Sequence, residues 1–144
     1  MSERIDQFCE DLRLKLNKID EGLSEVKSKI KADNEAAAQD VRSHADRVQQ
    51  RIAQNRDKVA SARIEVKSWL AERKDATREK IAEWKAKRQT DKLEDRAAEA
   101  EGYAEAAIAL AAAALDDAEH AAMEAWLARN DANAAKAMQA PRGN

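Results

Sequence analysis

Residues 5–30 read IDQFCEDLRLKLNKIDEGLSEVKSKI, and the spacing of the apolar side chains in this stretch decides the fold. At about 100° per residue they fall on one side of an α-helix, with charged residues on the other side. The same angular register continues to Trp84, often at intervals of eleven residues, as in Phe8, Ile19 and Ile30. An eleven-residue period corresponds to about 3.67 residues per turn, so we expect a nearly straight helix without a strong left-handed supercoil.

This register predicts one helix over residues 3–88, about 85 residues and about 130 Å long. Gly22 and the pair Asp33-Asn34 are the local helix breakers within it, and the register passes through both unchanged. The alternative is a three-helix bundle with an extra turn near Asp33-Asn34, because both residues are good helix N-caps.

The angular register changes after Trp84. A new stripe then begins, rotated by nearly half a turn from the first. It consists of Leu93, Ala97, Ala100, Ala104, Ile108, Ala111, Leu115, Ala118, Ala122 and Trp126. This change places a hinge at about residues 89–91 and a second, alanine-rich helix over about 92–138. Thr90 or Asp91 is suited to cap that helix.

The expected fold is therefore all-α, an elongated, coiled-coil-like hairpin of two long helices in one domain. The domain covers residues 1–140, and residues 139–144 are expected to form a disordered tail. Small side chains in the second helix allow a close approach of the first. The residues expected to pack across the hairpin are Val59, Val66, Leu70, Trp84, Leu93, Ile108, Leu115 and Trp126.

The second helix would cover only about residues 45–88 of the first, which leaves the N-terminal apolar stretch without cover. We expect this stretch to mediate self-association, most simply in an antiparallel dimer that closes a four-helix bundle. The self-association face consists of Ile5, Phe8, Leu12, Leu16, Ile19, Leu23, Val26 and Ile30.

Basic residues flank the apolar stripe of residues 5–88 on both sides, and acidic residues gather opposite it. This layout is typical of helices that lie on anionic surfaces. In its eleven-residue period, basic flanks and acidic pole, the segment resembles exchangeable apolipoproteins and, more loosely, the phasins that coat bacterial polyester granules. The resemblance implies a coat on anionic lipid or on a hydrophobic granule. Ion pairs across a bundle interface also explain the same bases, and this is the explanation that we favour.

Chemistry-bearing residues are few. Asp116, His120 and Glu124 lie at helical spacing, and Asp117 with His120 resembles the carboxylate–histidine step of di-iron bundles. His120 faces away from the predicted contact stripe, so no metal site is expected. His44, at the edge of the first stripe, is interpreted as a residue that fixes helix register. The sequence contains no phosphate-binding loop and no nucleophile–histidine–acid motif, so we expect no enzymatic activity, cofactor or small-molecule substrate.

Composition supports a long-helix protein, because 38% of the residues are charged and the chain has three glycines and one proline. Cys9 is the only cysteine, which favours a reducing compartment, and the net charge of −2 argues against a nucleic-acid partner. The acidic residues among the first thirty exclude a signal peptide, which indicates a cytoplasmic protein. The leading hypothesis is a non-catalytic, self-associating helical scaffold, and the alternative is a peripheral surface coat.

Overall fold

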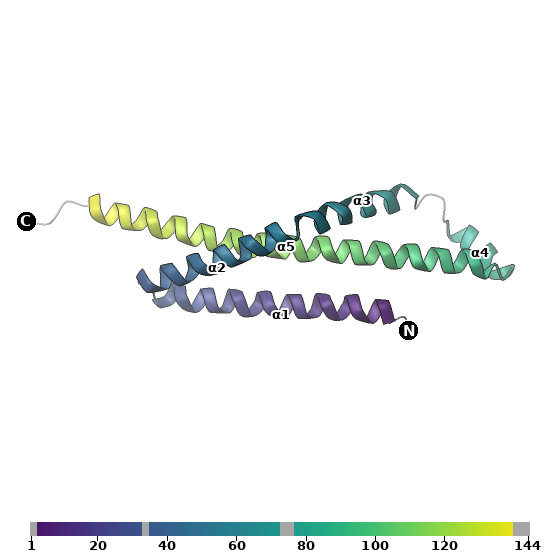
Figure 1. Cartoon of the computed structure of the whole chain (residues 1–144), viewed down its shortest axis with the longest axis horizontal. Coiled ribbons are helices and arrows are strands. Elements are labelled where there is room, and N and C mark those ends of the chain that lie inside the picture. Colours follow the sequence, from purple (N-terminus) through teal and green to yellow (C-terminus); the bar gives the residue numbers. More distant parts are fainter. Residues whose placement is uncertain (1–2, 33–34, 73–76, 140–144) are drawn as a thin grey trace, which may run out of the picture. The chain divides into compact units, whose positions relative to one another are not determined.

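The computed structural model of the chain describes residues 3–32, 35–72 and 77–139. These residues form five α-helices and no strand, so the predicted all-α class is confirmed for this part of the chain. In chain order the helices are α1 (Glu3–Ala32), α2 (Glu35–Gln54), α3 (Arg56–Glu72), α4 (Arg78–Ala86) and α5 (Thr90–Gln139) (Figure 1).

The prediction of a single helix over residues 3–88 is wrong. The chain reverses direction between Ala32 and Glu35, and α2 runs back along the C-terminal half of α1 (Figure 1). Lys29 Nζ and Asp40 Oδ2 are 2.9 Å apart, whereas residues eleven positions apart in one helix would be separated by about 16 Å. The alternative with an extra turn agrees with this reversal, but the turn residues named for it, Asp33-Asn34, lie outside the described residues.

The hinge predicted at residues 89–91 is close to the observed one, because α4 ends at Ala86 and α5 begins at Thr90. The connection is a Schellman motif. The Gln89 amide donates to the Trp84 carbonyl at 2.9 Å, and the Arg88 amide donates to the Lys85 carbonyl at 3.2 Å. The helix predicted over 92–138 is observed as Thr90–Gln139, and residues 140–144 of the predicted tail lie outside the described residues.

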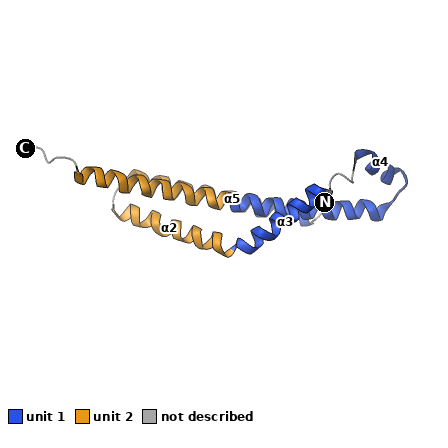
Figure 2. Cartoon of the chain, turned by 90° about the horizontal axis from the view of Figure 1, so that it is seen from above, with its two compact units in different colours: residues 1–15, 55–113 blue, residues 16–54, 114–144 orange. Residues whose placement is uncertain are grey.

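The helices contribute to two compact units. Unit 1 consists of residues 1–15 and 55–113, and unit 2 of residues 16–54 and 114–144 (Figure 2). In unit 1 the Trp69 ring stacks on the Tyr103 ring, with centroids 4.1 Å apart and an interplanar angle of 17°. The buried apolar residues described in unit 1 are the alanines Ala62 and Ala106, and the larger apolar side chains there are half-buried or exposed.

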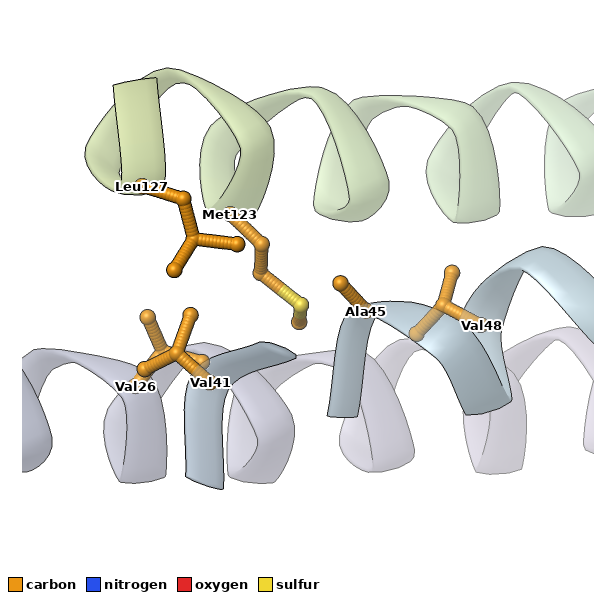
Figure 3. Packing of buried hydrophobic residues seen from close by; sticks show 6 residues of the cluster. All are labelled: Val26, Val41, Ala45, Val48, Met123 and Leu127. Carbon is orange, nitrogen blue, oxygen red and sulfur yellow. The ribbon is translucent and has the colours of Figure 1, made fainter. Parts of the chain in front are cut away.

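The core of unit 2 joins three helices. Met123 and Leu127 of α5 point toward α1 and α2 (Figure 3). Met123 and Val48 are completely buried, and Ile30, Ile52 and Trp126 pack around the cluster. The buried residues of this core are Val26, Val41, Ala45, Val48, Met123 and Leu127.

This core changes the predicted self-association face. Ile19 and Val26 are buried, and Ile30 packs against the core, so the expectation that the whole stretch lacks intramolecular cover is wrong. Leu16 and Leu23 remain 47% and 39% exposed. The other three residues of the predicted face, all in unit 1, are half-buried: Ile5, Phe8 and Leu12.

Candidate functional site

Two carboxylates of α5 lie in the interior of unit 2. Asp116 and Glu119 are only 2% and 3% exposed, and they lie on the face of α5 that also carries Met123. Burial of an ionised carboxylate costs several kcal/mol unless partners compensate for the lost hydration. The side chains that meet these two acids therefore define the strongest candidate site. We call it the ion cluster, and it consists of His44, Arg51, Asp116 and Glu119.

Helix α2 supplies the partners of both acids. The Nε and Nη2 atoms of Arg51 each lie 3.1 Å from Asp116 Oδ1, and Nη2 is also 3.7 Å from Glu119 Oε1. His44 Nε2 lies 3.0 Å from the same Glu119 oxygen. The second oxygen, Glu119 Oε2, is buried and has no hydrogen-bond partner among the described residues. The cluster thus holds two acids, the permanent charge of Arg51 and a histidine that adds a second positive charge when protonated.

The pairing fixes the register of α5 against α2. The two helices run in opposite directions, so Arg51 meets the earlier acid and His44, seven residues before it, meets the later one. A slip of one helical turn, about 5 Å, would break both contacts and leave buried charges without these partners. The geometry therefore supports a structural, register-fixing role of the cluster.

Helix α1 approaches the same cluster at Gly22. A Cβ atom at this position would lie 3.2 Å from Glu119 Oε1 and 3.3 Å from His44 Nε2. Both separations are shorter than a favourable contact of about 3.5–4.0 Å. The absence of a side chain at Gly22 therefore permits the close approach of α1 to the paired carboxylate and imidazole.

The histidines lie in different surroundings. His44, predicted to fix register, joins the ion cluster as described above. His120 is half-buried, with Nε2 3.6 Å from Glu124 Oε1 on the next turn of α5. Asp116, which lies at helical spacing from His120 and Glu124, pairs with Arg51 instead of with these two residues. Within the described residues, no three His, Cys, Asp or Glu side chains are grouped in a way that suits a metal ion.

The buried face of α5 within unit 2 differs in part from the predicted stripe, although Trp126 of that stripe packs against the core. In the C-terminal part of α5 the buried residues lie about 100° around the helix from the predicted stripe. They include Asp116, Glu119, Met123 and Leu127, and none of these was in the stripe. Alanine occurs on several faces of α5, so the apolar pattern has little power to orient this helix. Basic residues at matching spacing on α2 were the signal in the sequence that could have identified these acids as buried.

The residues predicted to pack across a hairpin are buried to different degrees. Trp126 packs against the unit 2 core, together with Ile30 and Ile52. Leu70, in unit 1, is 47% exposed. The remaining residues of that set are half-buried: Val59, Val66, Trp84, Leu93, Ile108 and Leu115.

A second ionic contact ties α1 to α5 within unit 1. Arg4 Nη2 donates to Glu105 Oε2 at 2.9 Å, and Arg4 Nη1 lies 3.8 Å from Glu101 Oε2. The side-chain hydrogen bond from Arg4 lowers the pKa of Glu105, and partial desolvation opposes the effect. Both side chains are more than 40% exposed, so solvent screening limits the contribution to stability.

Comparisons of the chain with protein-family models, with curated proteins and with solved structures find no match. The structure adds one finding about membranes: none of the described helices combines the length and the apolar content that a bilayer crossing requires.

Gly22→Ala and Gly102→Ala form a matched pair that tests the close approach at the cluster. Alanine stabilises a helix interior by about 1 kcal/mol relative to glycine. At Gly102 the new Cβ meets Glu65 Oε1 at 2.8 Å, but Glu65 is exposed and can move away. At Gly22 it meets the buried Glu119. We expect Gly102→Ala to stabilise the chain, and Gly22→Ala to be less stable than Gly102→Ala by about 1–3 kcal/mol in urea unfolding. Equal effects would contradict a close approach at Gly22.

Proposed function

We propose that the chain is a non-catalytic interaction protein that works as a helical scaffold by binding a second copy of itself. The proposal rests on the incomplete burial of one row of apolar residues of α1 in unit 2. Leu16, Ile19, Leu23, Val26 and Ile30 alternate at spacings of three and four residues, as in a coiled-coil seam. Ile19 and Val26 are buried, whereas Leu16 and Leu23 remain 47% and 39% exposed.

Leu16 and Leu23 are seven residues apart, so they lie on one side of α1. Each has about half of its surface left to bury, which is worth about 1 kcal/mol per leucine. The four leucines of a symmetric pair therefore contribute about 4 kcal/mol before the cost of association. A gain of this size corresponds to a dissociation constant of about 1 mM at best, so self-association is expected to depend on concentration up to the millimolar range, and the antiparallel dimer is the form we favour.

Sedimentation velocity over a concentration series tests this function. The expected result is a monomer that converts to a dimer as concentration rises, and a Leu16→Gln/Leu23→Gln variant that remains monomeric with unchanged helical circular dichroism. Asn17→Gln/Ser24→Gln is the matched control, because it has the same spacing on exposed positions of the same helix. A wild-type chain that stays monomeric throughout, or a leucine variant that dimerises like the control, would overturn the proposal.

A further inference from the structure

Helix α4 buries little surface against the rest of its unit. It spans Arg78–Ala86 and contains no buried residue. Ile81 and Trp84 are half-buried, and Lys92 of α5 places Nζ 5.8 Å from the centre of the Trp84 ring. Figure 1 shows α4 beside the first turns of α5. A helix with so little buried surface separates from its neighbour more readily than α1 or α2, because little packing opposes the separation.

The charges of α4 are arranged around these two apolar residues. At about 100° per residue, Lys80 and Lys87 lie on one side of Ile81 and Trp84, and Arg78 and Lys85 lie on the other. The acids Glu79 and Glu83 occupy the opposite pole. All four bases are exposed. This is the arrangement of a helix that places apolar side chains into an interface while its bases stay at the level of anionic groups.

The bases are concentrated in space as well as in sequence. Residues 77–92 contain six basic and three acidic residues. The pKa of Glu83 is lowered first by the hydrogen bond from Lys87, and Lys92 and Lys80 contribute further through their charges. One carboxylate thus experiences bases from α4, from its C-terminal turn and from α5. The segment has a net positive charge, whereas residues 93–139 contain ten acidic and three basic residues.

Arg88 adds a base at a position where glycine is the usual residue. Its φ of 54° lies in the left-handed region, at the C′ position of the Schellman turn that ends α4. A side chain at this φ is less favourable than glycine. Arg88 is exposed beside Lys87 and near Lys92, so the turn carries an additional positive charge at a conformational cost.

We propose that α4 and the turn into α5 form a docking surface for anionic phospholipid bilayers, with Ile81 and Trp84 inserted at the interface and Arg78, Lys80, Lys85, Lys87, Arg88 and Lys92 around them. Charge complementarity selects an anionic partner, and the apolar centre between the two basic flanks fits the boundary between headgroups and acyl chains. A nucleic acid presents phosphates as well, but it offers no apolar layer to Ile81. This surface is separate from the Leu16–Leu23 seam.

The test uses the full-length chain with Trp69→Phe and Trp126→Phe, which leaves Trp84 as the only tryptophan. We measure co-sedimentation and tryptophan emission with vesicles of phosphatidylcholine alone, and with vesicles of equal parts phosphatidylcholine and phosphatidylglycerol. The expected result is salt-sensitive binding to the anionic vesicles only, accompanied by a blue shift of the Trp84 emission. Absence of binding, or equal binding to both kinds of vesicle, would overturn the proposal.

A matched pair of variants locates the surface. Lys80→Gln/Lys85→Gln/Arg88→Gln is expected to lower the partition coefficient about a hundredfold, at about fivefold per base. Lys18→Gln/Lys27→Gln/Lys31→Gln removes the same charge from exposed positions of α1 and is expected to lower it far less. Equal losses in the two variants would contradict docking through α4. So would tighter binding to a nucleic-acid duplex than to the anionic vesicles without a shift of Trp84 emission.

Arg88→Gly separates binding from folding. Glycine relieves the left-handed position, so the thermal midpoint is expected to stay the same or rise. Loss of the base is expected to weaken anionic-vesicle binding about fivefold. Unchanged vesicle binding in this variant would remove Arg88 and its turn from the surface.

Discussion

Met123→Ala is expected to lower the free energy of unfolding of the chain by about 2–5 kcal/mol. Met123 is completely buried, and its side chain fills the space between α5 and the two helices of the N-terminal hairpin (Figure 3). Truncation removes apolar contacts and leaves a cavity that surrounding helices close only in part. A loss of this size is a large fraction of the total stability of a domain, which is about 5–15 kcal/mol.

Urea unfolding followed by circular dichroism measures this effect. Met138→Ala is the internal control, because Met138 is 88% exposed and its truncation is expected to change stability by less than about 0.5 kcal/mol. Met123→Leu keeps most of the volume and is expected to cost less than about 1.5 kcal/mol. If Met123→Ala and Met138→Ala unfold at the same urea concentration, Met123 is not at the centre of a packed core.

Arg51→Met is expected to destabilise the chain by about 2–3 kcal/mol. The substitution keeps much of the apolar stem but removes the guanidinium that contacts Asp116 and Glu119. Removing one partner of a buried ion pair costs about 3–5 kcal/mol, and we expect less here because the Arg51 side chain is 28% exposed. Arg47→Met, at an exposed position of the same helix, is the control and is expected to be nearly neutral.

A combined variant shows whether the ion cluster acts as a network. Adding Asp116→Asn and Glu119→Gln to Arg51→Met removes the two negative charges that the arginine compensated. We expect the triple variant to be more stable than the sum of the three separate losses predicts, because neutral residues need no cation. Strictly additive losses would show that the arginine and the acids contribute independently.

The helical class and the hinge before α5 could be predicted from sequence because both depend on local patterning. Few residues favour turns, and the angular phase of the apolar positions resets between Trp84 and Leu93. The reset marks a change in the direction of the apolar face, which favours a break between two helices. The predicted hinge therefore lies within a few residues of the end of α4 at Ala86.

The reversal between α1 and α2 was predicted only as the alternative, and the reason is physical. Only two residues separate the helices, so the angular phase of the second helix can match that of the first by coincidence of spacing. The angular phase shows which side of a helix is apolar. It does not show whether the following helix continues in the same direction or folds back onto the same core. Contacts such as the one between Lys29 and Asp40 decide this, and they depend on tertiary packing.

The ion cluster could not be predicted for a different reason. Asp and Glu are almost never fully buried without a partner, and nothing in the sequence of α5 itself marks Asp116 and Glu119 as buried. Their burial depends on Arg51 and His44, which lie 65 and 75 positions away in the chain. Spacing within α5 alone does not reveal such partners.

Unit 2 is assembled from two separate segments of the chain, residues 16–54 and 114–144. During translation the α1–α2 hairpin leaves the ribosome well before Met123 and Leu127 are synthesised. Until then Val26, Val41 and Val48 lack the helix that completes their core, and His44 and Arg51 lack their acids. The nascent hairpin therefore exposes apolar surface until the C-terminal half of the last helix closes the core.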